Sequence, residues 1–185
     1  MSNPGNVTIS QAVPPAEPAP RKLEETFTAE SLEAFLFGEA TLGQVLGVNV
    51  QEAYAIAELA FNLAQGGDLD RALALAEGLV LLNPRHAYFH SLLASIHIRR
   101  ERFDDALRHL NVAIGLDPDE IASRVNRGEI LLVRGELEAA LVDFSRAIEL
   151  DARGTDPMAR RARVLVSLGA EILRRSIEGA EARQS

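Results

Sequence analysis

One sequence pattern occurs three times in this chain, at a spacing of 34 residues. The copies span residues 53–86, 87–120 and 121–154. A fixed period of this length is typical of repeats that bury their apolar faces only by stacking on one another. Position 20 of each copy is alanine and position 8 is small, at Ala72, Ala106 and Ala140 and at Ala60, Ala94 and Gly128.

Each copy divides into two apolar-periodic halves of roughly 14 residues, the length of an ordinary helix. Gly67 and Gly135 occupy the turns between the halves, where a positive φ is easiest for glycine. Glu101 stands at this place in the second copy, so we expect a less comfortable turn there. A side-chain cap before a proline predicts a helix start at Asn83-Pro84, Asp117-Pro118 and Asp156-Pro157.

With this period and these small residues, the copies resemble tetratricopeptide repeats, which are helix–turn–helix units that stack into a curved solenoid. The resemblance implies an all-α fold. We expect a right-handed tetratricopeptide-repeat solenoid of three helix pairs, preceded by an N-terminal helical unit and closed by a C-terminal capping helix.

The segments before the repeats have different compositions. Residues 1–26 carry five of the eight prolines and few large apolar side chains, which predicts a disordered Pro-rich tail. Residues 27–48 predict the N-terminal helical unit, and the repeat region occupies residues 49–154. Two roles for this unit stay open: capping the end of the stack, or joining two copies into a homodimer through Phe35, Leu36 and Phe37.

Residues 155–180 predict the C-terminal capping helix, which the cap at Asp156-Pro157 begins. One face of this helix carries an apolar stripe and the other carries arginines. The arginine face is interpreted as a solvated surface, with docking of an acidic partner as the alternative. These arginines are Arg160, Arg161, Arg163, Arg174 and Arg175.

The composition excludes several classes of function. A formal net charge of −8 argues against a surface for nucleic acid or for an anionic membrane. The absence of cysteine excludes disulfides, cysteine zinc sites and a cysteine nucleophile. No apolar run approaches the roughly 18 residues that a membrane helix needs, and no secretory signal is visible. We therefore expect a cytoplasmic protein that does not insert into membranes.

No pattern for catalysis or cofactor binding stands out. His86, His90 and His97 fall on one predicted helix, but no carboxylate recurs beside them at matching spacing. Because His97 takes position 11, normally a core position, a packing role is the better interpretation. No phosphate loop, nucleophile elbow or carboxylate pair is present. The prediction is therefore a protein that is not an enzyme, with no metal and no cofactor.

The concave face remains as the place for function. In a tetratricopeptide stack, positions 2, 5, 9 and 12 of each first helix face this groove. An apolar and aromatic lining suits an extended segment of a protein client. The alternative is that the N-terminal helices cover some of these positions. The predicted lining is Tyr54, Ala57, Phe61, Ala64, Tyr88, Ser91, Ser95, Ile98, Ala122, Val125, Glu129 and Leu132.

Two comparisons with known groups sharpen this expectation. Repeat proteins that hold chaperone tails resemble one another in a carboxylate clamp of Lys and Asn, but this chain has Ala57 and Phe61 at those places. Residues 33–173 instead resemble the class II translocator chaperones of type III secretion systems. The resemblance rests on Glu33-Ala34-Phe35-Leu36-Phe37-Gly38, Leu59-Ala60-Phe61-Asn62, Tyr88-Phe89 and Gly128-Glu129-Ile130-Leu131-Leu132.

This second resemblance implies a cytoplasmic chaperone, often dimeric, that binds an apolar segment of a secreted translocator in the groove of its repeats. Binding would keep the client soluble until export. A general scaffold or adaptor in another protein assembly stays open as the alternative.

Overall fold

The computed structural model describes residues 27–181, with side chains up to residue 171. The predicted tail, residues 1–26, lies outside the described residues. Between residues 27 and 181 all regular structure is helical, which confirms the all-α prediction. The helices are α2 (Ala29–Leu36), α3 (Leu42–Val45), α4 (Val50–Gln65), α5 (Leu69–Leu82), α6 (Ala87–Arg99), α7 (Phe103–Leu116), α8 (Ile121–Val133), α9 (Leu137–Leu150) and α10 (Pro157–Glu181).

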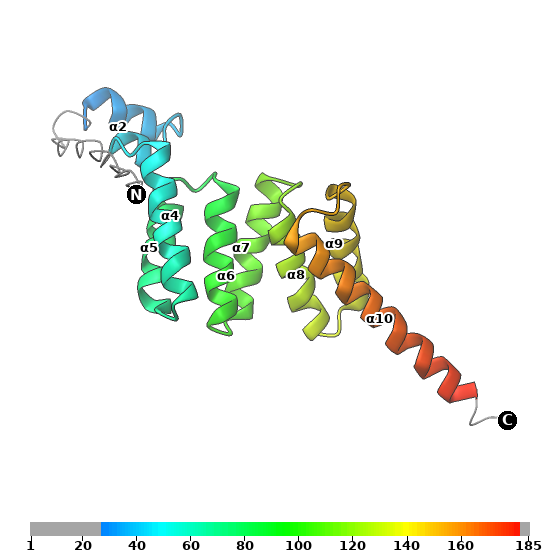
Figure 1. Ribbon diagram of the computed structural model, residues 1–185. Coiled ribbons are helices and arrows are strands. Elements are labelled where there is room, and N and C mark those ends of the chain that lie inside the picture. The colour runs from blue at the N-terminus through cyan, green and yellow to red at the C-terminus, as the bar shows by residue number, and fades with distance from the viewer. Residues whose placement is uncertain (1–26, 182–185) are drawn as a thin grey trace, which may run out of the picture.

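Three helix pairs form the body of the molecule: α4 with α5, α6 with α7, and α8 with α9. Each pair also packs on the next, so the pairs stand side by side in one row (Figure 1). The small residues are needed where the helices meet. Ala60 and Ala94 are fully buried, and a Cβ at Gly128 would lie 2.6 Å from Cε1 of Phe144.

The turn within each repeat has the same left-handed backbone. Gly67 has a φ of 88° and Gly135 a φ of 79°. Glu101, at the corresponding place, has a φ of 58° and is the one non-glycine residue with positive φ in the described part of the chain. The prediction of a less comfortable turn there is confirmed, because a Cβ is disfavoured in this region.

Two of the three helix starts predicted from cap–proline pairs are wrong. Helix α6 begins at Ala87 and α8 at Ile121, which is three residues after each proline. The side chain of Asn83 instead accepts a hydrogen bond from the backbone N–H of Arg85, which makes a local turn between helices. Only Asp156-Pro157 begins a helix as predicted, because Asp156 accepts from the backbone N–H groups of Met158 and Ala159.

The N-terminal unit lies at one end of the stack (Figure 1). Helix α2 packs on α3, and α3 packs on α5. Capping boxes begin α2 at Thr28, α3 at Thr41 and α4 at Asn49. In each box the capping side chain accepts from the backbone N–H three residues further on.

At the other end, α10 packs on α8 and α9 and then continues beyond them, away from the row (Figure 1). Ala159 and Ala162 are its fully buried contacts with the stack. Within residues 27–181, no helix combines the length and the hydropathy that a membrane span requires.

Candidate peptide-binding groove

The first helices of the repeats carry most of the predicted groove residues, and three aromatic side chains among them are exposed. Tyr54 and Phe61 on α4 are 45% and 47% exposed, and Tyr88 on α6 is 38% exposed. Helices α2 and α3, which pack on one another and on α5, leave these rings open to solvent. The described N-terminal helices therefore do not cover this part of the surface.

The positions closest to the neighbouring repeat are buried rather than exposed. Ala57 and Val125 have no exposed surface, and Ser91 is only 5% exposed. All three take position 5, which lies where adjacent first helices meet; Ala57 packs in one apolar cluster with Phe89 and Leu92 of α6. The prediction that position 5 lines the groove needs this correction, because close packing of successive repeats leaves no space for a peptide there.

The remaining positions give a narrower lining than the sequence predicts. Ala64 is also buried, and Ser95, Ile98 and Ala122 are half-buried. Leu132 is 36% exposed at the end of α8. The binding role of these residues stays a prediction.

An aromatic cluster occupies the end of this surface near α4. The hydroxyl of Tyr54 lies 3.2 Å from Nε2 of His86, and the rings of Tyr54 and Tyr88 are 5.8 Å apart. His86 stacks on Phe89 at 4.1 Å. Tyr54, His86 and Tyr88 border an open cavity of about 340 Å³. Aromatic walls with a polar tip are a common arrangement at protein-binding surfaces.

His86 and Glu120 join this surface although the sequence reasoning did not include them. Each takes position 34, immediately before the first residue of a helix. Oε1 of Glu120 accepts a hydrogen bond from the hydroxyl of Ser91 at 3.0 Å, and Oε2 accepts from the backbone N–H of Ser123. Both residues border the cavity. A comparison of position 34 between the repeats is the sequence signal that identifies them.

The side chains of His86 and Tyr88 at this end are uncharged near neutral pH. Burial lowers the pKa of His86, which favours its neutral ring. Burial also raises the pKa of Tyr88, and the nearby Tyr54 and Glu58 raise it further. Two neutral hydroxyls and a neutral imidazole can therefore hydrogen-bond to the backbone of an extended peptide.

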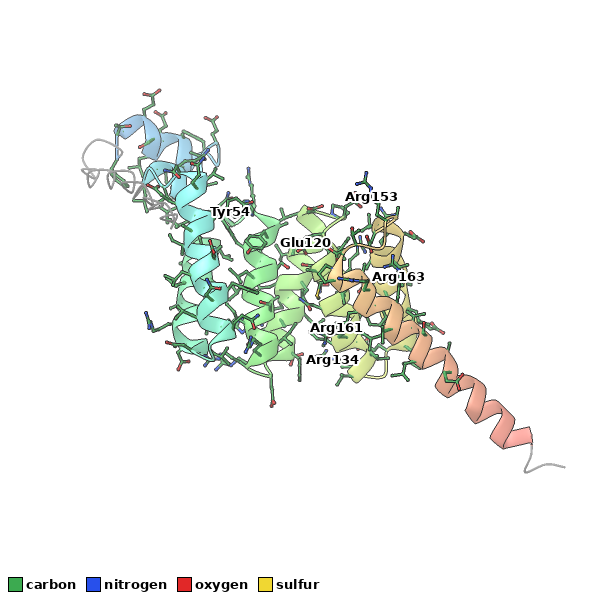
Figure 2. All side chains as sticks on the ribbon, in the orientation of Figure 1. Tyr54, Glu120, Arg134, Arg153, Arg161 and Arg163 are labelled. Carbon is green, nitrogen blue, oxygen red and sulfur yellow. The ribbon has the colours of Figure 1, made fainter. Side chains whose placement is uncertain are left out.

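The end of the surface near α10 is charged instead. Nη2 of Arg161 on α10 donates to Oε2 of Glu129 on α8 at 2.9 Å. Burial raises the pKa of Glu129, and Arg161 opposes this rise. Figure 2 shows Tyr54 and Arg161 at opposite ends of the row of repeats. The exposed aromatic lining therefore lies in the first two repeats, and the third repeat adds Leu132.

Two of the arginines on α10 have partners within the chain. Besides the pair formed by Arg161, Arg163 donates to Asp151 at 2.9 Å. Each of these two guanidinium charges is therefore offset by a carboxylate of the chain itself.

The predicted self-association residues lie on the surface of the N-terminal unit. Phe35 is 40% exposed, Leu36 73% and Phe37 75%. Such apolar exposure is typical of an interaction surface, and the homodimer stays a prediction.

The histidines of the sequence do not form a metal site within residues 27–171, where no group of three or more His, Asp or Glu side chains could hold an ion. His97 is 6% exposed, so its predicted packing role is confirmed. His109 of α7 stacks on it, a contact that the single-helix interpretation missed.

Comparisons with known proteins agree on the repeat. Family models described as "Tetratricopeptide repeat" match residues 54–121 and 93–167. Among curated proteins, the TPR repeat-containing thioredoxin TDX of Arabidopsis thaliana is 27% identical over 108 residues, which are 58% of this chain and 28% of the relative. Stress-induced-phosphoprotein 1 of Caenorhabditis elegans is 29% identical over 46% of this chain and 27% of its own length. The chain thus spans less than a third of either relative.

Solved structures give the same fold. A type III secretion system complex from Aeromonas hydrophila has a TM-score of 0.64 at 26% identity, over 75% of this chain and 94% of that one. The translocator chaperone SycD of Yersinia enterocolitica has a TM-score of 0.63 at 22% identity, over 70% and 98%. PcrH, solved with the chaperone-binding region of PopB, has a TM-score of 0.58 at 23% identity, over 64% and 97%.

Proposed function

This chain belongs to the tetratricopeptide repeat family, and on that basis we propose that it is a cytoplasmic chaperone for a translocator of a type III secretion system. It binds an extended apolar segment of this client in the groove of its first two repeats. Binding covers a segment that would otherwise aggregate or insert into a membrane, and the client stays soluble until export. The chain acts by binding alone, without catalysis.

The observation that carries this proposal is the exposed aromatic lining of α4 and α6. Tyr54, Phe61 and Tyr88 stand open to solvent on adjacent first helices, and a cavity lies between two of them. Apolar anchors of a client fit between these rings, while its backbone hydrogen-bonds to the hydroxyls. The likeness to a type III secretion system complex and to the translocator chaperone SycD supports a client of this class.

Binding of a chaperone tail through its terminal carboxylate is disfavoured by the same surface. The two clamp places hold Ala57, which is buried, and Phe61, which is uncharged. A carboxylate clamp needs charged or amide donors at these places, because only a strong hydrogen bond offsets the cost of desolvating a carboxylate.

The test is co-expression of the chain with a candidate translocator, followed by measurement of complex formation with the purified proteins. Phe61→Ala and Tyr88→Ala each remove a central anchor, and we expect each to weaken binding by about 2 kcal/mol, or about 30-fold. Val142→Ala is a matched control, since this side chain on α9 is also exposed and lies outside the groove. Unchanged capture by the double variant would exclude the groove as the binding site.

A further inference from the structure

The space between the two helices of a repeat is filled by different chemistry in each copy. Positions 4, 11 and 23 meet there. In the first repeat all three are apolar and pack on the core. In the third, Asp143 accepts two hydrogen bonds of 2.7 Å from Arg127 and lies 3.6 Å from Arg124. The equivalent residues are Ile56, Leu63 and Leu75 in the first repeat, His90, His97 and His109 in the second, and Arg124, Leu131 and Asp143 in the third.

The histidines of the second repeat form a directed hydrogen-bond chain. Nε2 of His90 lies 3.0 Å from the carbonyl oxygen of Pro84, which only accepts, so this nitrogen carries a proton. Nδ1 of a neutral His90 is then an acceptor, and Nδ1 of His109, at 3.1 Å, donates to it. The chain therefore ties the linker before α6 to α7, and it requires that at least one of the two rings is neutral.

His97 completes a stack of three rings. It lies parallel to His109, with ring centres 5.7 Å apart and planes inclined by 8°. His90 also stacks on His109, with ring centres 5.4 Å apart. His90 and His97 are each only 6% exposed, and the buried Nδ1 of His97 has no hydrogen-bond partner. An added proton would place a charge where little water can solvate it.

Protonation of both His90 and His109 would break the chain, because two N–H groups would then point at each other across 3.1 Å. Burial lowers the pKa of His109 to about 4, and the neighbouring His90 and His97 add to this effect. Burial likewise lowers the pKa of His97. The cluster is thus stable only while its rings are neutral.

The charged groups around the cluster do not reverse this preference. Two carboxylates act on His97, namely Glu77 of α5 and Asp105 of α7. Asp105 is itself paired with Arg108. Arg100 and Arg102, at the turn between α6 and α7, act on His97, whereas Arg127 of α8 donates to Asn111 of α7. The groups acting on His97 or His109 are Glu77, Arg100, Arg102, Asp105 and Arg108.

We propose that the joint between α6 and α7 is an acid-sensitive switch, in which protonation of His90, His97 and His109 loosens the central repeat while the outer repeats hold. This goes beyond the proposed function and does not depend on any client. In the unfolded chain His97 and His109 bind protons below about pH 6.5, and in the folded chain their burial opposes protonation. The stability from the neutral cluster is therefore complete above about pH 6.5 and is lost as the pH falls toward 4.

The first repeat supplies the residues for the test. In the triple variant His90→Ile, His97→Leu and His109→Leu, the second repeat receives the side chains that the first repeat has at these positions. Urea unfolding of the full chain is followed by circular dichroism at pH 7.5 and pH 5.0. We expect the folding equilibrium constant of the unmodified chain to fall on the order of 10- to 100-fold more than that of the variant, the lower end reflecting partial solvation of His109.

His86→Asn is the matched control, because His86 is also partly buried but lies outside the cluster, beside Tyr54. We expect it to retain most of the acid sensitivity. Equal losses in the unmodified chain and the triple variant, or loss of the sensitivity in His86→Asn alone, would overturn the proposal.

Hydrogen exchange locates the effect and needs no variant. After correction for intrinsic exchange rates, amides of α6 and α7 should lose protection between pH 7.5 and pH 5.0 by a larger factor than those of α8 and α9. This measurement decides the matter even if the triple variant does not fold. A uniform loss along the stack, or no loss in α6 and α7, would contradict an acid-sensitive central joint.

Discussion

The contact between Gly128 and Phe144 allows a sharp test of how the helices of a repeat are spaced. A Cβ at position 128 would lie 2.6 Å from Cε1 and 2.9 Å from Cδ1 of Phe144, where ordinary van der Waals contact begins near 3.4 Å. Phe144 is 2% exposed and packs in the core cluster of the third repeat. We therefore expect Gly128→Ala to force α8 and α9 apart.

The magnitude follows from two opposing effects. Overpacking a rigid core by one methyl group costs about 2 kcal/mol. Replacing glycine by alanine within a helix gains about 1 kcal/mol through backbone entropy. The net expectation for Gly128→Ala is a loss of about 1 kcal/mol in the free energy of unfolding.

Gly78 provides the matched control. It also lies inside a helix, α5, but a Cβ there meets nothing within 4 Å. Gly78→Ala should therefore raise the free energy of unfolding by up to about 1 kcal/mol. Urea unfolding of both variants under the same conditions gives the difference, expected near 2 kcal/mol. Equal stabilisation by the two substitutions would refute the close approach of α8 and Phe144.

Two further substitutions test the interior of the stack. Asp143→Ala leaves the partly buried Arg127 and Arg124 without their carboxylate, and we expect a loss of about 3 kcal/mol in urea unfolding; a change below about 1 kcal/mol would mean that the pair is solvated. Glu101→Gly removes the side chain from a residue with a φ of 58°. We expect it to raise the free energy of unfolding by roughly 0.5–1 kcal/mol, and the thermal midpoint with it. Gly67→Ala, at a φ of 88°, should lower the thermal midpoint. The same shift of the midpoint in both variants would contradict the strain at Glu101.

The repeat itself could be predicted from the sequence because its period is enforced by packing. Helices at a fixed distance admit only small residues where they cross, so Ala60, Ala94 and Gly128 recur at one position. The turns at Gly67 and Gly135 follow from backbone sterics, which are local and therefore visible in a short stretch of sequence.

Features that depend on a choice between local partners, or on contacts beyond one helix, were not predicted. Asn83 before Pro84 has the composition of a helix cap, but its side chain has a nearer backbone partner in Arg85. Ala57 lies on the predicted face of α4, yet the next repeat buries it. His109 is 19 residues from His90, so a search for spacings within one helix does not find it, whereas comparison of position 23 between copies does.

The side chains between the paired helices differ among the three repeats, and this difference affects how the molecule unfolds. Cooling weakens the aliphatic filling of the first repeat, because apolar stabilisation fades at low temperature. Added salt barely reaches the ion pairs of Asp143 in the third, where little solvent enters. Repeats of the same shape are therefore destabilised by different conditions, and the temperature and the solvent determine which repeat unfolds first.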